Sequence, residues 1–293
     1  MKKKIQTGSN SQSLLGGATI LASSVIIVKI IGMLFKIPIN SMLGGTGTGC
    51  FNAAYDLYGP IESLANAGFP VAISKMVSDY CAKGRYRDTR QLHKVSIPMF
   101  ICTGMIAFFA MICLAPIYAK ATNAPRIIYA TFVLAPTVFF VCMMSIYKGY
   151  YQGLSNMIPT AKSEIVEAFS KLIIGVGTVT LLVKLGKSIL NFNSEELAKY
   201  GAAMAILGVT CGAFIGFLYI LSWHKKHGDG ITIEQLKSSP KPFSSKTTIK
   251  KLIKIALPIG LAAITMNIGG LVDATLVQRR LGNIMHSDAG KVI

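Results

Sequence analysis

The chain has 293 residues, of which 52% are hydrophobic and only 14% are charged, and its mean hydropathy is +0.53. Soluble globular domains usually carry about 25% charged residues, so this composition excludes an ordinary soluble domain. The formal net charge of +18 would suit nucleic-acid binding. However, the cations gather in short segments between long apolar runs, which is typical of cytoplasmic loops in membrane proteins. The sequence therefore predicts an all-α polytopic membrane protein that binds no nucleic acid.

The first long apolar run, residues 13–44, predicts a membrane-spanning helix over about residues 13–42, because a span needs roughly 20 apolar residues. It is too long for a signal peptide, so we expect a retained helix behind a cytoplasmic N-terminus. Lys29 and Lys36 are seven residues apart and fall on nearly one helix face. A cation at the bilayer centre costs roughly 2.5 to 3.5 kcal/mol, which favours a face directed into a cavity. Alternatively, Lys36 extends its ammonium to the nearby interface.

A second helix is predicted over about residues 51–80, after a glycine-rich turn at residues 43–49. It contains Asp56 and Glu62, which flank the helix-breaking pair Gly59-Pro60. Acidic residues beside a break in a spanning helix are typical of substrate or ion sites in transporters. The alternative for Asp56 is a position near the outer interface, where the carboxylate is simply hydrated.

The basic segment at residues 81–94 is expected to be a cytoplasmic loop, with His93 as a solvated side chain. Three more helices are predicted over about residues 95–118, 127–151 and 160–183. In the last of these, Glu164, Glu167 and Lys171 share one face. They form either a polar cavity wall or a structural ion pair that packs this helix against a neighbour.

The sixth helix, predicted over about residues 200–223, is rich in glycine and alanine, which favours close helix packing. A polar, basic linker follows at residues 224–250, and a seventh helix over about residues 251–276 carries Asp273. We therefore expect a six-helix lobe at residues 1–223, this cytoplasmic linker, and residues 251–293 as the start of an incomplete second lobe. Such a layout suggests a fragment or a truncated product. The six cysteines lack metal-ligand spacing and are expected to be buried free thiols.

Several stretches carry a family resemblance, most specifically KGYYQG at residues 148–153 followed by NMIPTA at residues 156–161. The others are LGGTGTG at residues 43–49 with YDLY at 55–58, GFPVAISK at 68–75, and the pattern Pro258, Asp273, Arg280-Leu281-Gly282. Together they resemble the polysaccharide-flippase branch of the multidrug/oligosaccharidyl-lipid/polysaccharide exporter superfamily, in particular the stage V sporulation protein B group, which is related to lipid II flippases.

This resemblance implies a two-lobed bundle with alternating access to a central cavity, and undecaprenyl-pyrophosphate-linked saccharides or peptidoglycan precursors as substrates. It also implies that the first helix brings cations to the cavity, where this chain has Lys29 and Lys36 rather than arginines. Lysine lacks the bidentate fork that suits a phosphate. Asp273 matches an acidic position of the family.

The expected function is therefore flipping of a lipid-linked saccharide across a bacterial cytoplasmic membrane, without catalysis, cofactor or metal. Alternatives are a cation-coupled multidrug exporter, a membrane enzyme such as a sugar-lipid transferase, and an inactive fragment. The expected partners are the lipid-linked saccharide and membrane lipids, with possible self-association or a missing second lobe.

Overall fold

A computed structural model of the chain describes residues 14–122, 124–188 and 192–289. Within these ranges the chain is helical and contains no strands, which confirms the predicted all-α fold. Lys2 to Lys4, on which the cytoplasmic N-terminus was predicted, and the last four residues of the polar tail lie outside the described ranges. The elements are α1 (Leu14–Glu62), the π-helix η1 (Ser63–Ala67), α2 (Phe69–Ala82), α3 (Tyr86–Ala121), α4 (Ile127–Gly153), α5 (Ile158–Ser188), α6 (Ser194–His227), α7 (Ile233–Ser238) and α8 (Ser245–Ala289).

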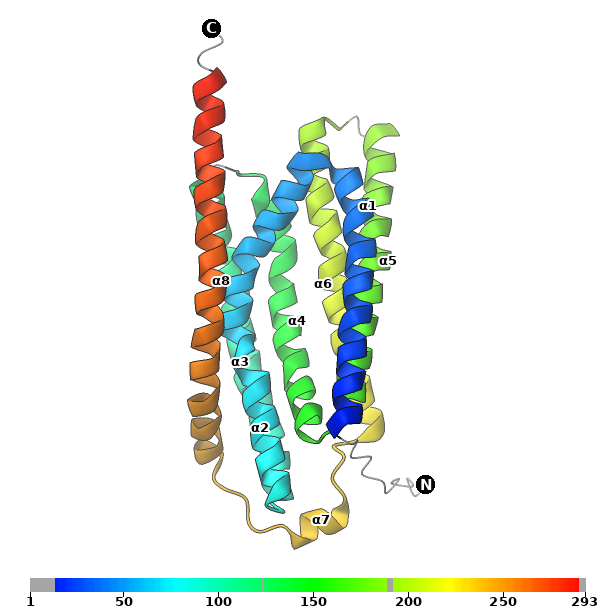
Figure 1. The fold of residues 1–293 in the computed structure, drawn as a ribbon, viewed down its shortest axis with the longest axis vertical. Helices are drawn as coiled ribbons and strands as arrows, with labels where there is room; N and C mark the ends of the chain where they lie inside the picture. The colour runs from blue at the N-terminus through cyan, green and yellow to red at the C-terminus, as the bar shows by residue number, and fades with distance from the viewer. Residues whose placement is uncertain (1–13, 123, 189–191, 290–293) are drawn as a thin grey trace.

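Five of the described helices are long and apolar enough to cross a membrane, namely α1, α3, α4, α5 and α6. The longest, α1, contains two limbs, because the backbone bends at Gly44 with φ 64° and ψ −171°. A positive φ at this bend favours glycine, since other residues clash with their own backbone there. The first limb (residues 14–43) runs beside α5, and the second limb (residues 45–62) descends from the bend toward α2 (Figure 1). A bend at one residue thus replaces the predicted turn at residues 43–49.

The most extensive helix packing among the described residues is between α5 and α6, which lie side by side along the bundle (Figure 1). A Cβ atom added to Gly208 of α6 would lie only 2.3 Å from Cα of Gly175 on α5. One added to Gly212 would lie 2.9 Å from the carbonyl oxygen of Glu167. These contacts confirm the close packing predicted from the glycine content of the sixth helix, because only glycine allows backbones to approach so closely.

Two expectations for the segment at residues 81–94 are wrong. Helix α3 begins at Tyr86, so most of this segment is helical. His93 is 8% exposed and is not a solvated loop residue. Its ring lies 4.8 Å from the ring of Tyr150 and 4.9 Å from that of His224 (centroid distances). His93 is buried because the aromatic ends of α4 and α6 cover this part of α3. The local sequence does not reveal this tertiary contact.

The connections α2–α3, α4–α5 and α6–α8 all lie at the end of the bundle where α1 begins, the lower end in Figure 1. We call it the linker end, because the segment with α7 crosses it. Helix α8 runs up the bundle beside α2 and α3. A Cβ added to Gly68, between η1 and α2, would meet the carbonyl oxygen of Ala256 on α8 at 2.0 Å. The division of the chain into two lobes at residues 224–250 remains a prediction.

All six cysteines are free, as expected, but their predicted burial holds only for Cys50 and Cys142. Cys102 and Cys113 are exposed on α3, and the remaining two are partly buried. The burial of the cysteines was overestimated because an apolar run in a membrane protein includes the face that contacts lipid.

Candidate functional site

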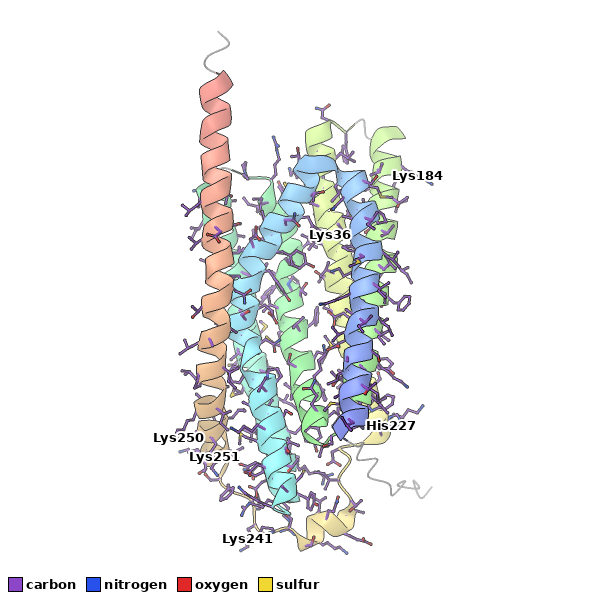
Figure 2. All side chains as sticks on the ribbon, viewed as in Figure 1. Lys36, Lys184, His227, Lys241, Lys250 and Lys251 are labelled. Carbon is purple, nitrogen blue, oxygen red and sulfur yellow. The ribbon has the colours of Figure 1, made fainter. Side chains whose placement is uncertain are left out.

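The two lysines of the first limb of α1 have exposed side chains. The buried face of this limb is formed by Ile31, Phe35 and Ile39 at intervals of four residues, and the two lysines lie on the neighbouring face, roughly a third of a turn away. This spacing places the three apolar side chains along one stripe against the bundle. Lys29 and Lys36 are therefore available to a neighbouring lobe, a ligand or lipid. Figure 2 shows Lys36 on the upper half of the limb.

A third lysine connects both limbs of α1 with α5. The ammonium of Lys171 lies 4.8 Å from the ring centroid of Phe35 on the first limb and 5.8 Å from that of Tyr55 on the second limb. The negative face of an aromatic ring attracts such a cation. Lys171 is also close enough to Lys36 for their positive charges to repel, and to Glu167 for attraction.

Three of the predicted acidic residues, Glu62 on α1 and Glu164 and Glu167 on α5, come together around a lysine of α4. The ammonium of Lys148 lies 3.3 Å from Oε1 of Glu164, and both side chains are only partly exposed. Glu62 accepts a hydrogen bond of 2.9 Å from the side-chain amide of Asn66 in η1. Glu167 interacts electrostatically with Lys148, Glu164 and Glu62. We call Glu62, Asn66, Lys148, Glu164, Glu167 and Lys171 the polar cluster.

The polar cluster lies on helices that are otherwise strongly apolar. Charges in such a position are costly unless they pair with one another or face water. Three carboxylates and two ammonium groups leave an excess of hydrogen-bond acceptors. The arrangement can therefore accept hydrogen bonds from hydroxyl groups or attract a cation, while Lys148 and Lys171 can attract an anion.

Helix α8 makes a polar contact beside this cluster. The side-chain amide of Asn267 donates a hydrogen bond of 2.8 Å to Oγ of Ser63, the first residue of η1. A π-helix within a longer helical run is rare and often marks a functional position. The helix expected over residues 51–80 is thus interrupted at residues 63–68, where Asn66 and Ser63 present their polar groups.

The structure brings together Glu62, Glu164 and Glu167, and Lys36 is close enough to Lys171 of the polar cluster for their positive charges to repel. It does not place the other three predicted residues with them. Asp56 is partly buried on the second limb, Lys29 is exposed on the first, and Asp273 is exposed on α8. Lys148, Asn66 and the Ser63–Asn267 pair were not predicted as site residues. Lys148 could have been predicted from the sequence, because it is the single charged residue of the apolar helix α4.

The described residues thus form a bundle of long apolar helices with charged side chains inside it, as in a multi-pass membrane protein. The fold is similar to that of a MOP superfamily transporter from Pyrococcus furiosus, with TM-score 0.60, 16% identity, and coverage of 91% of this chain and 57% of that one. It is also similar to the outward-facing conformation of a multidrug resistance MATE family transporter, with TM-score 0.61, 17% identity, and coverage of 91% and 57%.

The chain belongs to the polysaccharide biosynthesis protein family, whose model matches residues 14–285. It is 27% identical to the lipid II flippase MurJ of Bacillus subtilis (strain 168), over 92% of this chain and 50% of MurJ. It is 25% identical to the stage V sporulation protein B of the same organism, over 84% of this chain and 45% of that protein. The chain thus spans about half the length of these curated relatives.

Proposed function

We propose that this chain is part of a transporter that flips an undecaprenyl-pyrophosphate-linked saccharide across the bacterial cytoplasmic membrane by alternating access. The observation that carries the proposal is its membership of the polysaccharide biosynthesis family, together with relatives named as a lipid II flippase and a sporulation protein. On this proposal the chain moves its substrate without changing it chemically, so it is not an enzyme.

The charged residues support this activity on physical grounds. A flippase must stabilise an anionic, hydroxyl-rich headgroup at membrane depth while the lipid tail stays in hydrocarbon. Lys29 and Lys36 are exposed on α1 and could neutralise a pyrophosphate, although as point charges rather than bidentate partners. The carboxylates of Glu62, Glu164 and Glu167 could accept hydrogen bonds from sugar hydroxyls. Asp56 and Asp273 would add acceptors on the second limb and on α8.

Alternating access also requires a second lobe that moves against the first. We propose that α8 begins this lobe, and that the rest comes from a longer chain or from a second copy. The basic linker end would lie in the cytoplasm, because Lys and Arg are enriched in cytoplasmic loops.

A cation-coupled multidrug exporter is the second candidate, and the acidic excess of the polar cluster favours it. Such a protein needs ion-binding carboxylates and does not need Lys29. The two candidates therefore differ in which charges are essential. An inactive fragment would need neither set.

The test is lipid translocation in proteoliposomes. A fluorescent undecaprenyl-pyrophosphate saccharide is incorporated, and its movement to the outer leaflet is followed by quenching with dithionite. Lys29→Glu and Lys36→Glu place negative charge where the proposed site needs cations, and we expect each to reduce the initial rate at least about tenfold. Lys184→Glu is the matched control, because Lys184 is exposed near the far end of α5 (Figure 2) and its reversal changes net charge equally.

Transport of a cationic dye is measured in the same proteoliposomes. Dye export that persists in Lys29→Glu and is lost in Glu167→Gln would identify the multidrug exporter instead. A wild-type chain that moves neither lipid nor dye would contradict transport by this chain alone.

A further inference from the structure

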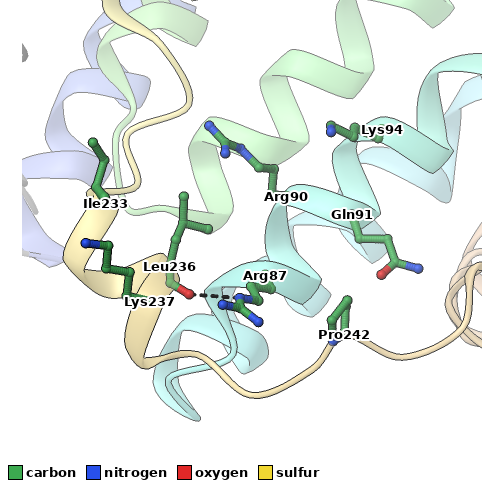
Figure 3. Close-up of a pocket in the computed structure, with 8 residues that line it drawn as sticks. All are labelled: Arg87, Arg90, Gln91, Lys94, Ile233, Leu236, Lys237 and Pro242. Atoms are coloured by element: carbon green, nitrogen blue, oxygen red, sulfur yellow. Dashed lines mark hydrogen bonds between the residues drawn. The ribbon is translucent and has the colours of Figure 1, made fainter.

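A pocket of about 460 Å³ lies at the linker end, between the beginning of α3 and α7 (Figure 3). Its lining contains four basic side chains and no carboxylate: Arg87, Arg90, Lys94 and Lys237. The other lining residues are Gln91, Ile233, Leu236 and Pro242. It shares no residue with the polar cluster and has no part in the proposed function. Cations from two separate elements thus converge on a partly apolar hollow.

The basic residues of α3 occupy one face of the helix. Arg87, Arg90 and Lys94 follow one another at intervals of three and four residues, which superimposes them along a single stripe. Lys237 approaches from α7 on the other side, as Figure 3 shows. The pocket is therefore more than a loop rich in lysine, because its charges are held around a common space.

Hydrogen bonds between α3 and the linker fix the walls of the pocket. Nε of Arg87 donates to the carbonyl oxygen of Leu236 at 2.9 Å, and the backbone N–H of Arg87 donates to Oγ of Ser239 at 3.0 Å. Arg90 pairs with Asp229 at 2.5 Å, just before α7. Both guanidinium groups keep further N–H donors, because each has five in total. These contacts hold the basic side chains in place, so they are not a set of independent surface charges.

The same face of α3 becomes apolar immediately above the pocket. Ile101 and Met105 follow Lys94 by seven and eleven residues, so they extend its stripe along the helix, and they are 42% and 37% exposed. Lys94 lies at the start of this apolar run, where α3 would enter the bilayer. Exposed apolar side chains in this position would contribute nothing to the binding of a soluble anion. A lipid would place its headgroup among the cations and its acyl chains along α3.

We propose that this pocket binds the phosphate-bearing headgroup of an anionic phospholipid. The chemistry that it recognises is a phosphate ester with net negative charge, and the apolar face of α3 identifies a membrane lipid as its source rather than a soluble phosphate. Each cation near an anionic membrane surface strengthens binding roughly fivefold.

The experiment uses the full chain in nanodiscs of phosphatidylcholine that contain a small fraction of dansyl-labelled phosphatidylglycerol. Energy transfer from Trp223, the single tryptophan, which lies near the end of α6 at the linker end, reports on lipid held nearby. The double variant Lys94→Gln/Lys237→Gln removes two pocket charges whose side chains are exposed. Because two cations are removed, we expect roughly 30-fold weaker binding of the labelled lipid.

The matched control is Lys225→Gln/Lys226→Gln, which removes two exposed charges from the last turn of α6, outside the pocket. It lowers net charge equally and should retain the wild-type affinity. Equal weakening by both double variants would overturn the proposal, since the binding would then be a general effect of surface charge. An unchanged affinity in the pocket variant would overturn it as well.

A competition arm identifies the source of the phosphate. Inorganic phosphate at millimolar concentration is added to the wild-type nanodiscs at constant ionic strength. Retention of the labelled lipid supports a lipid site. Displacement by inorganic phosphate would overturn the assignment to a lipid and make the pocket a site for soluble phosphate.

Discussion

Replacing Asp88 with alanine should release the linker from α3. The side chain of Asp88 is fully buried. Its Oδ1 accepts the backbone N–H of Phe243 at 2.7 Å, and its Oδ2 accepts Nε of Arg85 at 2.8 Å. One carboxylate thus joins the start of α3 to the residues just before α8. Alanine would leave the N–H without a partner and the guanidinium without its carboxylate.

The free-energy cost of Asp88→Ala is the sum of two lost interactions, one with the N–H of Phe243 and one with the guanidinium of Arg85. An orphaned buried N–H costs about 1 to 3 kcal/mol. Arg85 loses less than a fully buried cation would, because it is partly exposed, still donates to the carbonyl oxygen of Lys241 at 3.2 Å, and lies 3.7 Å from the ring centroid of Phe243. A further loss of about 1 kcal/mol is reasonable for this ion pair. We therefore expect the linker contact to weaken by about 2 to 4 kcal/mol.

Native-state proteolysis in detergent measures this opening, because the linker contains a trypsin site at Lys237, which is followed by Ser238. When opening and closing are fast, cleavage follows the open population, so about 2 to 4 kcal/mol corresponds to roughly 30- to 1000-fold faster cleavage. Asp79→Ala is the control, because the Asp79–Lys83 pair is 51% and 62% exposed and contributes at most about 1 kcal/mol. Asp88→Asn should fall between the two, since an amide oxygen can still accept the N–H. Equal cleavage of Asp88→Ala and Asp79→Ala would refute the reasoning.

Three further predictions concern packing and pairing. Gly68→Ala should lower the thermal unfolding midpoint in detergent and loosen α8, because its Cβ would overlap the carbonyl oxygen of Ala256, whereas Gly32→Ala, which meets no neighbour, should not. Lys148→Gln and Glu164→Gln, combined in a double-mutant cycle of thermal stability, should show a coupling of about 0.5 to 2 kcal/mol, and zero coupling would contradict their ion pair. Tyr151→Phe should destabilise the chain by about 1 kcal/mol in the same measurement, since its hydroxyl donates to the carbonyl oxygen of Gly228 at 2.9 Å. Tyr80→Phe serves as its comparison, because the buried hydroxyl of Tyr80 makes no hydrogen bond within the described residues.

The overall architecture was predictable because it depends on composition summed over long windows. Apolar runs long enough to span a membrane predicted the helices of the bundle. The basic segments between them predicted that every second connection lies at the same end, which is the linker end. The bend of α1 at Gly44 was not predictable, because the five glycine and threonine residues at positions 45–49 allow a turn equally well. The start of α3 was missed because its first two turns are polar and charged, and in the structure they contact the linker more than 130 residues away.

The candidate site was predictable only in part, for a similar reason. Glu62, Glu164 and Glu167 stood out because each is a carboxylate within an apolar helix. Their pairing with Lys148 and Asn66 depends on how α4, α5 and η1 are placed relative to one another, which helical periodicity does not determine. The same limit applies to Asp273, because a residue in an apolar run can face protein or lipid, and in this structure it is exposed.

The contacts of α8 indicate where the two proposed lobes would separate. Near its beginning, α8 is held by the backbone contact of Ala256 with Gly68, so this part should move with the first lobe. Higher up, the hydrogen bond from Asn267 to Ser63 is a single polar contact, and such bonds in membranes contribute only about 0.6 kcal/mol on average. We therefore expect α8 to separate from η1 at Asn267. A disulfide across this contact, formed in Ser63→Cys/Asn267→Cys on a cysteine-free background, should stop lipid translocation and release it on reduction. Full translocation by the oxidised variant would show that this contact stays closed throughout the transport cycle.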